Sequence, residues 1–70
     1  MTLFINCIFG DGPQTLIKVN ATDADVAAIE AAMSGDPGDV LRVVCRTTSQ
    51  GKDHERLIRA GAIRSVDVER

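Results

Sequence analysis

The chain has no Trp and no Tyr, and only two Phe among its 70 residues. Aromatic rings stack nucleic-acid bases and anchor many peptide grooves, so both kinds of site have few candidates here. The formal net charge of −2 points the same way, because proteins that bind polyanions are usually strongly basic. These absences argue against nucleic acid as the principal partner.

Metal-binding and nucleophilic residues are equally scarce. Cys7, Cys45 and His54 are the only thiols and the only imidazole, and they lie far apart in the sequence. A structural zinc site usually needs four such ligands, and a secreted disulfide scaffold needs more cysteines. Both Cys fall on the inward faces of predicted strands, where a thiol acts as a small hydrophobic group. We therefore expect no metal, no cofactor and no enzymatic activity.

Long hydrophobic runs are also missing. The apolar stretch 3–9 is too short to span a bilayer and lacks the basic flank of a signal peptide. This predicts a cytoplasmic protein with no membrane partner. A chain of 70 residues forms one domain, residues 1–70, with a thin core that often needs self-association for support.

Two strands and a helix are predicted in the first half. Residues 3–9 and 15–19 are rich in β-branched and aromatic side chains, and the turn residues 10–13 join them into a hairpin. Thr22 is a good helix N-cap, and Asp25 is its capping-box partner. Gly35 ends the helix. Its expected buried face consists of Val26, Ile29 and Met33.

Three more strands are predicted in the second half. Residues 40–46 alternate, with Leu41, Val43 and Cys45 on one side. Residues 54–60 fit a strand or a short helix, and the hairpin-like loop before them favours the strand. Gly61 makes a corner before a last strand at 63–68. The order ββαβββ predicts an α+β fold, a mostly antiparallel sheet with one helix packed on one face.

Charge is divided unequally along the chain. Residues 1–39 carry one Lys against six acids, which gives −5, and residues 40–70 carry seven bases against four acids, which gives +3. The segment 49–52 resembles the end of a phosphate-binding loop but lacks its first Gly and its final Ser or Thr. An exposed Gly-containing loop with a Lys can still hold an anion. The predicted anion-binding residues are Arg42, Arg46, Lys52 and Arg56.

The first strand carries apolar residues on both faces. One face consists of Leu3, Ile5, Cys7 and Phe9. Phe4 and Ile8 lie on the other face, with only the polar Asn6 between them. One helix covers only one face of a sheet. Either the sheet curls into a partial barrel, or a second subunit covers Phe4 and Ile8, which are therefore the predicted interface residues.

Residues 57–68 resemble the penultimate strand, tight corner and final strand of Sm-like proteins. The resemblance covers about a sixth of the chain and implies ring assembly and RNA binding through that corner. The internal helix departs from the Sm-like order, in which the helix comes first. In its use of Ala, Arg, Asp and Val, the whole chain is similar to short ββα-type proteins of unknown function from high-GC bacteria and their phages.

Three functions follow from these observations. The first is a non-enzymatic homo-oligomeric interaction module whose basic sheet surface meets an acidic protein surface. The second is a phage or bacterial protein that binds or sequesters an anionic small molecule or nucleotide at a subunit interface. The third, implied by the resemblance, is Sm-like RNA binding.

Overall fold

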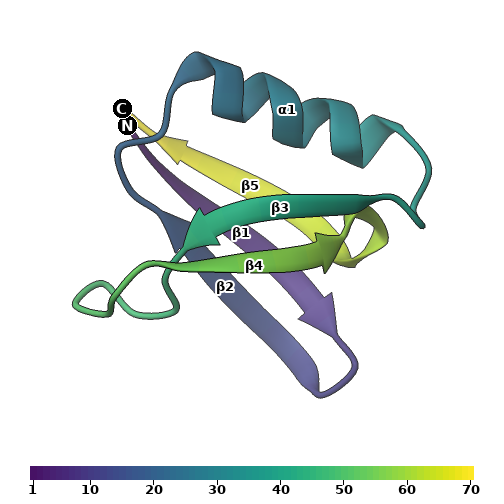
Figure 1. Cartoon of the computed structure of the whole chain (residues 1–70), viewed down its shortest axis with the longest axis horizontal. Coiled ribbons are helices and arrows are strands. Elements are labelled where there is room, and N and C mark those ends of the chain that lie inside the picture. Colours follow the sequence, from purple (N-terminus) through teal and green to yellow (C-terminus); the bar gives the residue numbers. More distant parts are fainter.

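The computed structural model describes residues 1–70 and contains five strands and one long helix (Figure 1). The strands are β1 (Thr2–Phe9), β2 (Gly12–Lys18), β3 (Val40–Cys45), β4 (His54–Arg59) and β5 (Ile63–Glu69), and the helix is α1 (Asp23–Ser34). A one-turn 3₁₀ helix, Ala60–Ala62, joins β4 to β5. The predicted order ββαβββ and the α+β class are confirmed, as is the strand preferred at residues 54–60.

The strands form two antiparallel sheets instead of one. One sheet has the order β2-β1-β5, and the other is the hairpin of β3 and β4. A single pair joins them, because the backbone N–H groups of Ile17 and Arg46 each donate to the other residue's carbonyl, at 2.7 and 2.8 Å. The strands therefore follow one another as β4-β3-β2-β1-β5, and the sheet curls so that the β3–β4 hairpin lies across β1 (Figure 1).

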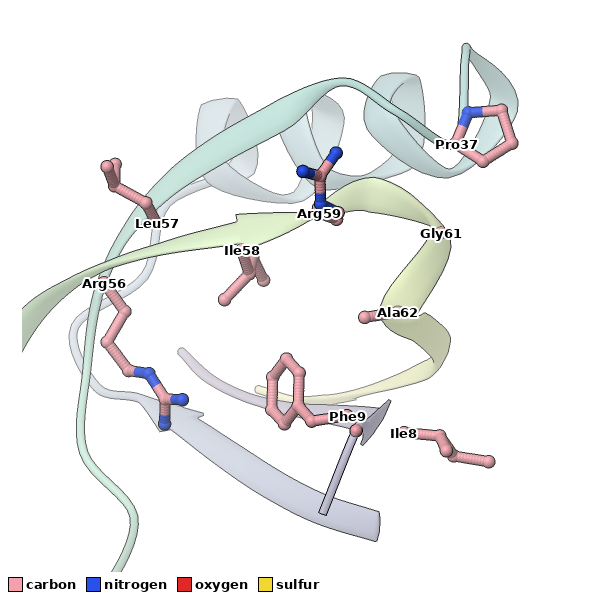
Figure 2. A pocket seen from close by; sticks show the side chains of 10 residues that line it. Ile8, Phe9, Pro37, Arg56, Leu57, Ile58, Arg59, Gly61 and Ala62 are labelled. Carbon is pink, nitrogen blue, oxygen red and sulfur yellow. The ribbon is translucent and has the colours of Figure 1, made fainter. Parts of the chain in front are cut away.

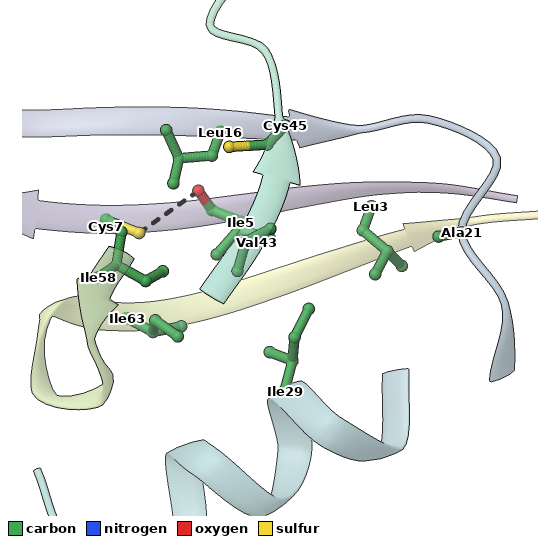
Figure 3. Packing of buried hydrophobic residues seen from close by; sticks show 10 residues of the cluster. All are labelled: Leu3, Ile5, Cys7, Leu16, Ala21, Ile29, Val43, Cys45, Ile58 and Ile63. Carbon is green, nitrogen blue, oxygen red and sulfur yellow. Dashed lines mark hydrogen bonds between the residues drawn. The ribbon is translucent and has the colours of Figure 1, made fainter. Parts of the chain in front are cut away.

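The core lies between the two sheets, and α1 closes one side of it. The inward residues of β1, namely Leu3, Ile5 and Cys7, are buried together with Val43 and Ile58 from the hairpin (Figure 3). Of the predicted helix face only Ile29 is fully buried, whereas Met33 remains 42% exposed. The helix therefore contributes one central side chain to the core.

The ends of α1 follow the local sequence signals. Thr22 has extended backbone angles, its hydroxyl accepts from the Asp25 N–H at 3.3 Å, and its own N–H donates to Asp25 Oδ2 at 2.8 Å. This is the predicted capping box, which satisfies two N–H groups that the helix cannot pair itself. The backbone hydrogen bond from Thr22 also lowers the pKa of Asp25. Gly35 ends the helix as predicted.

The outward face of β1 is apolar at its ends and polar at its centre. Phe4 is half-buried and Ile8 is 51% exposed. Asn6, between them, accepts from Thr15 Oγ1 at 2.9 Å and donates to Ser65 Oγ and Asp67 Oδ2, both at 3.1 Å. This polar cross-link across β2, β1 and β5 separates the two predicted interface residues, so Phe4 and Ile8 do not form one continuous apolar surface.

Candidate binding surface

The register of the β3–β4 hairpin decides which side chains face solvent. Arg42 lies opposite Leu57, Val44 opposite Glu55, and Val40 opposite Arg59. Side chains alternate along a strand, so these residues share one face while Val43, Cys45 and Ile58 point into the core. We call the solvent side the outer face, and its members are Val40, Arg42, Val44, Glu55, Leu57 and Arg59.

The outer face contains an unusual number of exposed apolar side chains. Val40 is 59% exposed, Val44 45% and Leu57 62%. They are three of only six large hydrophobic residues of the chain that are exposed. No other element of the chain covers this face, which lies toward the viewer in Figure 1. Exposed apolar side chains that gather on one face typically mark an interaction site.

Two of the predicted anion-binding residues already pair with carboxylates. Arg42 lies 3.1 Å from Glu55 on the outer face, and both side chains are well exposed. Arg46 Nε donates to Asp53 Oδ1 at 2.8 Å and its Nη1 donates to the Ser49 carbonyl at 3.4 Å. The hydrogen bond from Arg46 lowers the pKa of Asp53, and the same bond raises the pKa of Arg46. These two ion pairs neutralise much of the positive charge that was predicted to bind an anion.

The other two predicted residues lie elsewhere. Lys52 is exposed on the loop before β4. Arg56 is on the inward side of β4, opposite Val43, and therefore faces away from Arg42. Its guanidinium lies 5.2 Å from the centre of the Phe9 ring and donates to Gln14 Oε1 at 3.2 Å. The structure therefore does not bring the four cations together on one surface.

A groove runs between β4 and the end of β1 (Figure 2). Its volume is about 460 Å³, within the usual range for ligand sites. Arg56 and Ile58 point toward Phe9, whereas Leu57 and Arg59 point to the opposite side of β4 (Figure 2). Ile8 and Ala62 complete the apolar lining, and no carboxylate side chain lines the groove. The two charged residues of the groove, Arg56 and Arg59, are therefore both cations.

Arg59 is the residue of this groove that the sequence prediction missed. Like Arg56, it makes no ion pair, whereas Arg42, Arg46 and Arg70 each have a carboxylate partner. The hairpin register was the signal that could have found it. Pairing Val40–Cys45 with His54–Arg59 places Glu55 beside Arg42 and leaves Arg59 opposite Val40.

Both thiols are buried and free, as expected for small core residues (Figure 3). Cys7 is 2% exposed and its Sγ lies 3.7 Å from the Ile5 carbonyl, to which it donates. Burial raises the pKa of both thiols, and the Arg56 guanidinium partly opposes this effect. The thiolate is the reactive form, so neither thiol is activated as a nucleophile.

We expect both thiols to resist iodoacetamide at neutral pH and to react fully after unfolding in urea. Because the folded pKa is raised, the protonated thiols stabilise the folded state fully below the unfolded pKa of about 8.5. That contribution is lost as the pH rises through the folded pKa. Urea unfolding from neutral to alkaline pH should show declining stability, and rapid alkylation of the folded protein would contradict the burial of the thiols.

No group of three or more His, Cys, Asp or Glu side chains is arranged to hold a metal ion. No helix is long and apolar enough to cross a membrane. No family model, curated protein or solved structure matches this chain.

Proposed function

We propose that the chain is a non-enzymatic interaction module that self-associates through the outer face of the β3–β4 hairpin. The observation that carries the proposal is the exposure of Val40, Val44 and Leu57 on one uncovered face. A chain this short buries a smaller fraction of its surface than a larger domain does, so pairing of such faces adds burial that one copy lacks.

The charges of the outer face favour a symmetric pair. A two-fold interface brings the same patch of two copies together, so it must complement itself. The outer face carries Arg42 and Arg59 together with Glu55, and only Arg42 is paired with that acid within the chain. In a two-fold arrangement, Glu55 of one copy can therefore lie against Arg59 of the other. Six residues per copy form a smaller patch than a standard interface, so we expect a weak dimer.

Sedimentation velocity over a range of concentrations tests this proposal with one variant and one control. We expect wild type to shift from monomer to dimer as its concentration rises, and Leu57→Asp to remain monomeric, because it introduces a charge into the apolar contact. Met33→Asp is the matched control, since Met33 is also exposed but lies on α1. Equal loss of dimer in both variants, or a wild type that stays monomeric, would contradict the proposed interface.

Sm-like RNA binding has less support than self-association, because the two aromatic side chains are poorly placed to stack on bases. Base stacking needs a free ring face. The guanidinium of Arg56 already covers one face of Phe9, and Phe4 is half-buried on the outward side of β1. The protein-interaction function is therefore the one we favour.

A further inference from the structure

Strand β4 has one edge that no other strand of the chain pairs. It forms hydrogen bonds with β3 on one side only, and the groove described above runs along its other side. The opposite wall of that groove is the end of β1, which does not pair with β4. An unpaired edge presents a row of backbone donors and acceptors that can accept another strand.

The register identifies the backbone groups on this edge. The Ala60 N–H donates to the Asp39 carbonyl at 2.8 Å, in line with the register of the hairpin. Hydrogen-bonded and non-bonded pairs alternate along an antiparallel ladder. Ile58 and Arg56 therefore bond to β3, whereas the N–H and C=O groups of Leu57 and the N–H group of Arg59 face the open edge. Arg59 is the N-cap of the 3₁₀ helix, so its C=O is the acceptor of that turn.

The side chains along this edge have a specific order. Arg56-Leu57-Ile58-Arg59 reads cation, apolar, apolar, cation, and the order is the same from either end. Alternation places Arg56 and Ile58 on the Phe9 side and Leu57 and Arg59 on the outer face (Figure 2). Each side of the strand thus offers one arginine without a carboxylate partner and one apolar side chain.

We propose that β4 accepts an extended peptide by strand addition, and that the preferred peptide carries an acid, two apolar residues and a second acid in succession. Backbone hydrogen bonds to both groups of Leu57 and to the Arg59 N–H would hold the peptide, and its side chains would give specificity. The first and last acids lie opposite Arg56 and Arg59 in either chain direction. The four residues of β4 that would pair with the peptide, 56–59, span about 10 Å at the usual rise per residue. The site shares Leu57 and Arg59 with the outer face of the proposed function, whereas Arg56, Ile58 and the open backbone edge belong to the peptide site alone.

The proposed occupant is a separate peptide and not the β5 strand of a second copy. β5 is the other outermost strand, since the Ile17–Arg46 pair joins β2 to β3. Its acids Asp67 and Glu69 are two residues apart, so they share one face of their strand. Arg56 and Arg59 lie on opposite faces of β4, so β5 cannot place one acid beside each of them.

Fluorescence anisotropy with a labelled peptide tests the site. The probe is a Glu-Val-Val-Glu segment flanked by Gly and Ser, and the control peptide has Lys in place of both Glu. We expect the Glu peptide to bind and the Lys peptide to fail. Arg56→Gln should weaken binding about tenfold, since it removes one charge-assisted contact. Arg64→Gln is the matched control, because Arg64 also lacks a carboxylate partner but lies outside the groove.

N-methylation of the probe distinguishes strand addition from simple anion binding. The two adjacent Val residues point their N–H groups in opposite directions in an extended strand, so only one faces β4. Methylation of one Val should abolish binding, and methylation of the other should leave it unchanged. Equal binding of both methylated peptides, displacement of the probe by an equal concentration of sodium glutamate, or unchanged affinity of Arg56→Gln would overturn the proposal. The Arg56 test is independent of the outer face, so its failure would leave the self-association proposal standing.

Discussion

Replacing Ile5 with alanine is expected to lower the free energy of unfolding by about 2–5 kcal/mol. Ile5 is fully buried in the central strand of the three-stranded sheet, between Leu16 of β2 and Val66 of β5. The core of so small a domain rarely supplies more than about 3–5 kcal/mol in total. The variant should therefore be largely unfolded at room temperature, as measured by far-ultraviolet circular dichroism during urea titration.

Ile8→Ala is the matched control for Ile5→Ala. It removes the same atoms from the same strand, but the side chain is 51% exposed. Substitutions at exposed positions usually change stability by less than about 0.5 kcal/mol, and the partial burial of Ile8 raises this expectation to about 1 kcal/mol. Similar losses in the two variants would show that the inward face of β1 is not the core.

Replacing Gly61 with alanine is expected to cost about 1–3 kcal/mol, the usual range for an overpacked site. A Cβ at this position would lie 2.9 Å from the Pro37 Cβ and 3.1 Å from its carbonyl oxygen. The Gly61 N–H also donates to that carbonyl at 2.9 Å, so the two segments cannot separate without losing the bond. The expected loss of stability therefore comes from crowding between the 3₁₀ helix and the loop after α1.

Gly10→Ala is the control for Gly61→Ala, because a Cβ at Gly10 would meet nothing within 4 Å. Its stability, measured by the same urea titration, should stay close to that of wild type. If the two glycine variants lose the same stability, the close approach of Gly61 to Pro37 does not constrain the fold.

The elements that the sequence predicted best are those set by local interactions. The helix limits follow from Thr22, Asp25 and Gly35, which act within one turn of the chain. The alternation in β3 likewise placed Val43 and Cys45 on one side, and that side is buried. Such patterns depend on the periods of helix and strand and require no knowledge of distant partners.

The features that the sequence did not reveal depend on pairing between distant residues. Asn6 appeared as an isolated polar residue, yet it joins three strands through Thr15, Ser65 and Asp67. Its network depends on the register of β1 with both neighbours, and that register cannot be obtained from periodicity. The second sheet was missed for the same reason, since a single pair between Ile17 and Arg46 marks where the strands separate.

The surface distribution of charge likewise depends on which distant residues pair. The sequence contrasts an acidic first half with a basic second half, but only the pair of Arg70 and Asp23 joins the two halves. The Arg42–Glu55 and Arg46–Asp53 pairs form within the second half. The unpaired arginines beside the groove are therefore Arg56 and Arg59, and composition alone could not place them.

The central claim is that the outer face of the β3–β4 hairpin is where two copies meet. The most direct test is a dilution series of the wild-type protein, followed by two-dimensional ¹H–¹⁵N correlation spectra. We expect concentration-dependent shifts to gather at Val40, Val44 and Leu57 and their strand neighbours. Spectra that do not change on dilution, or shifts that gather around Phe4 and Ile8 instead, would contradict this interface.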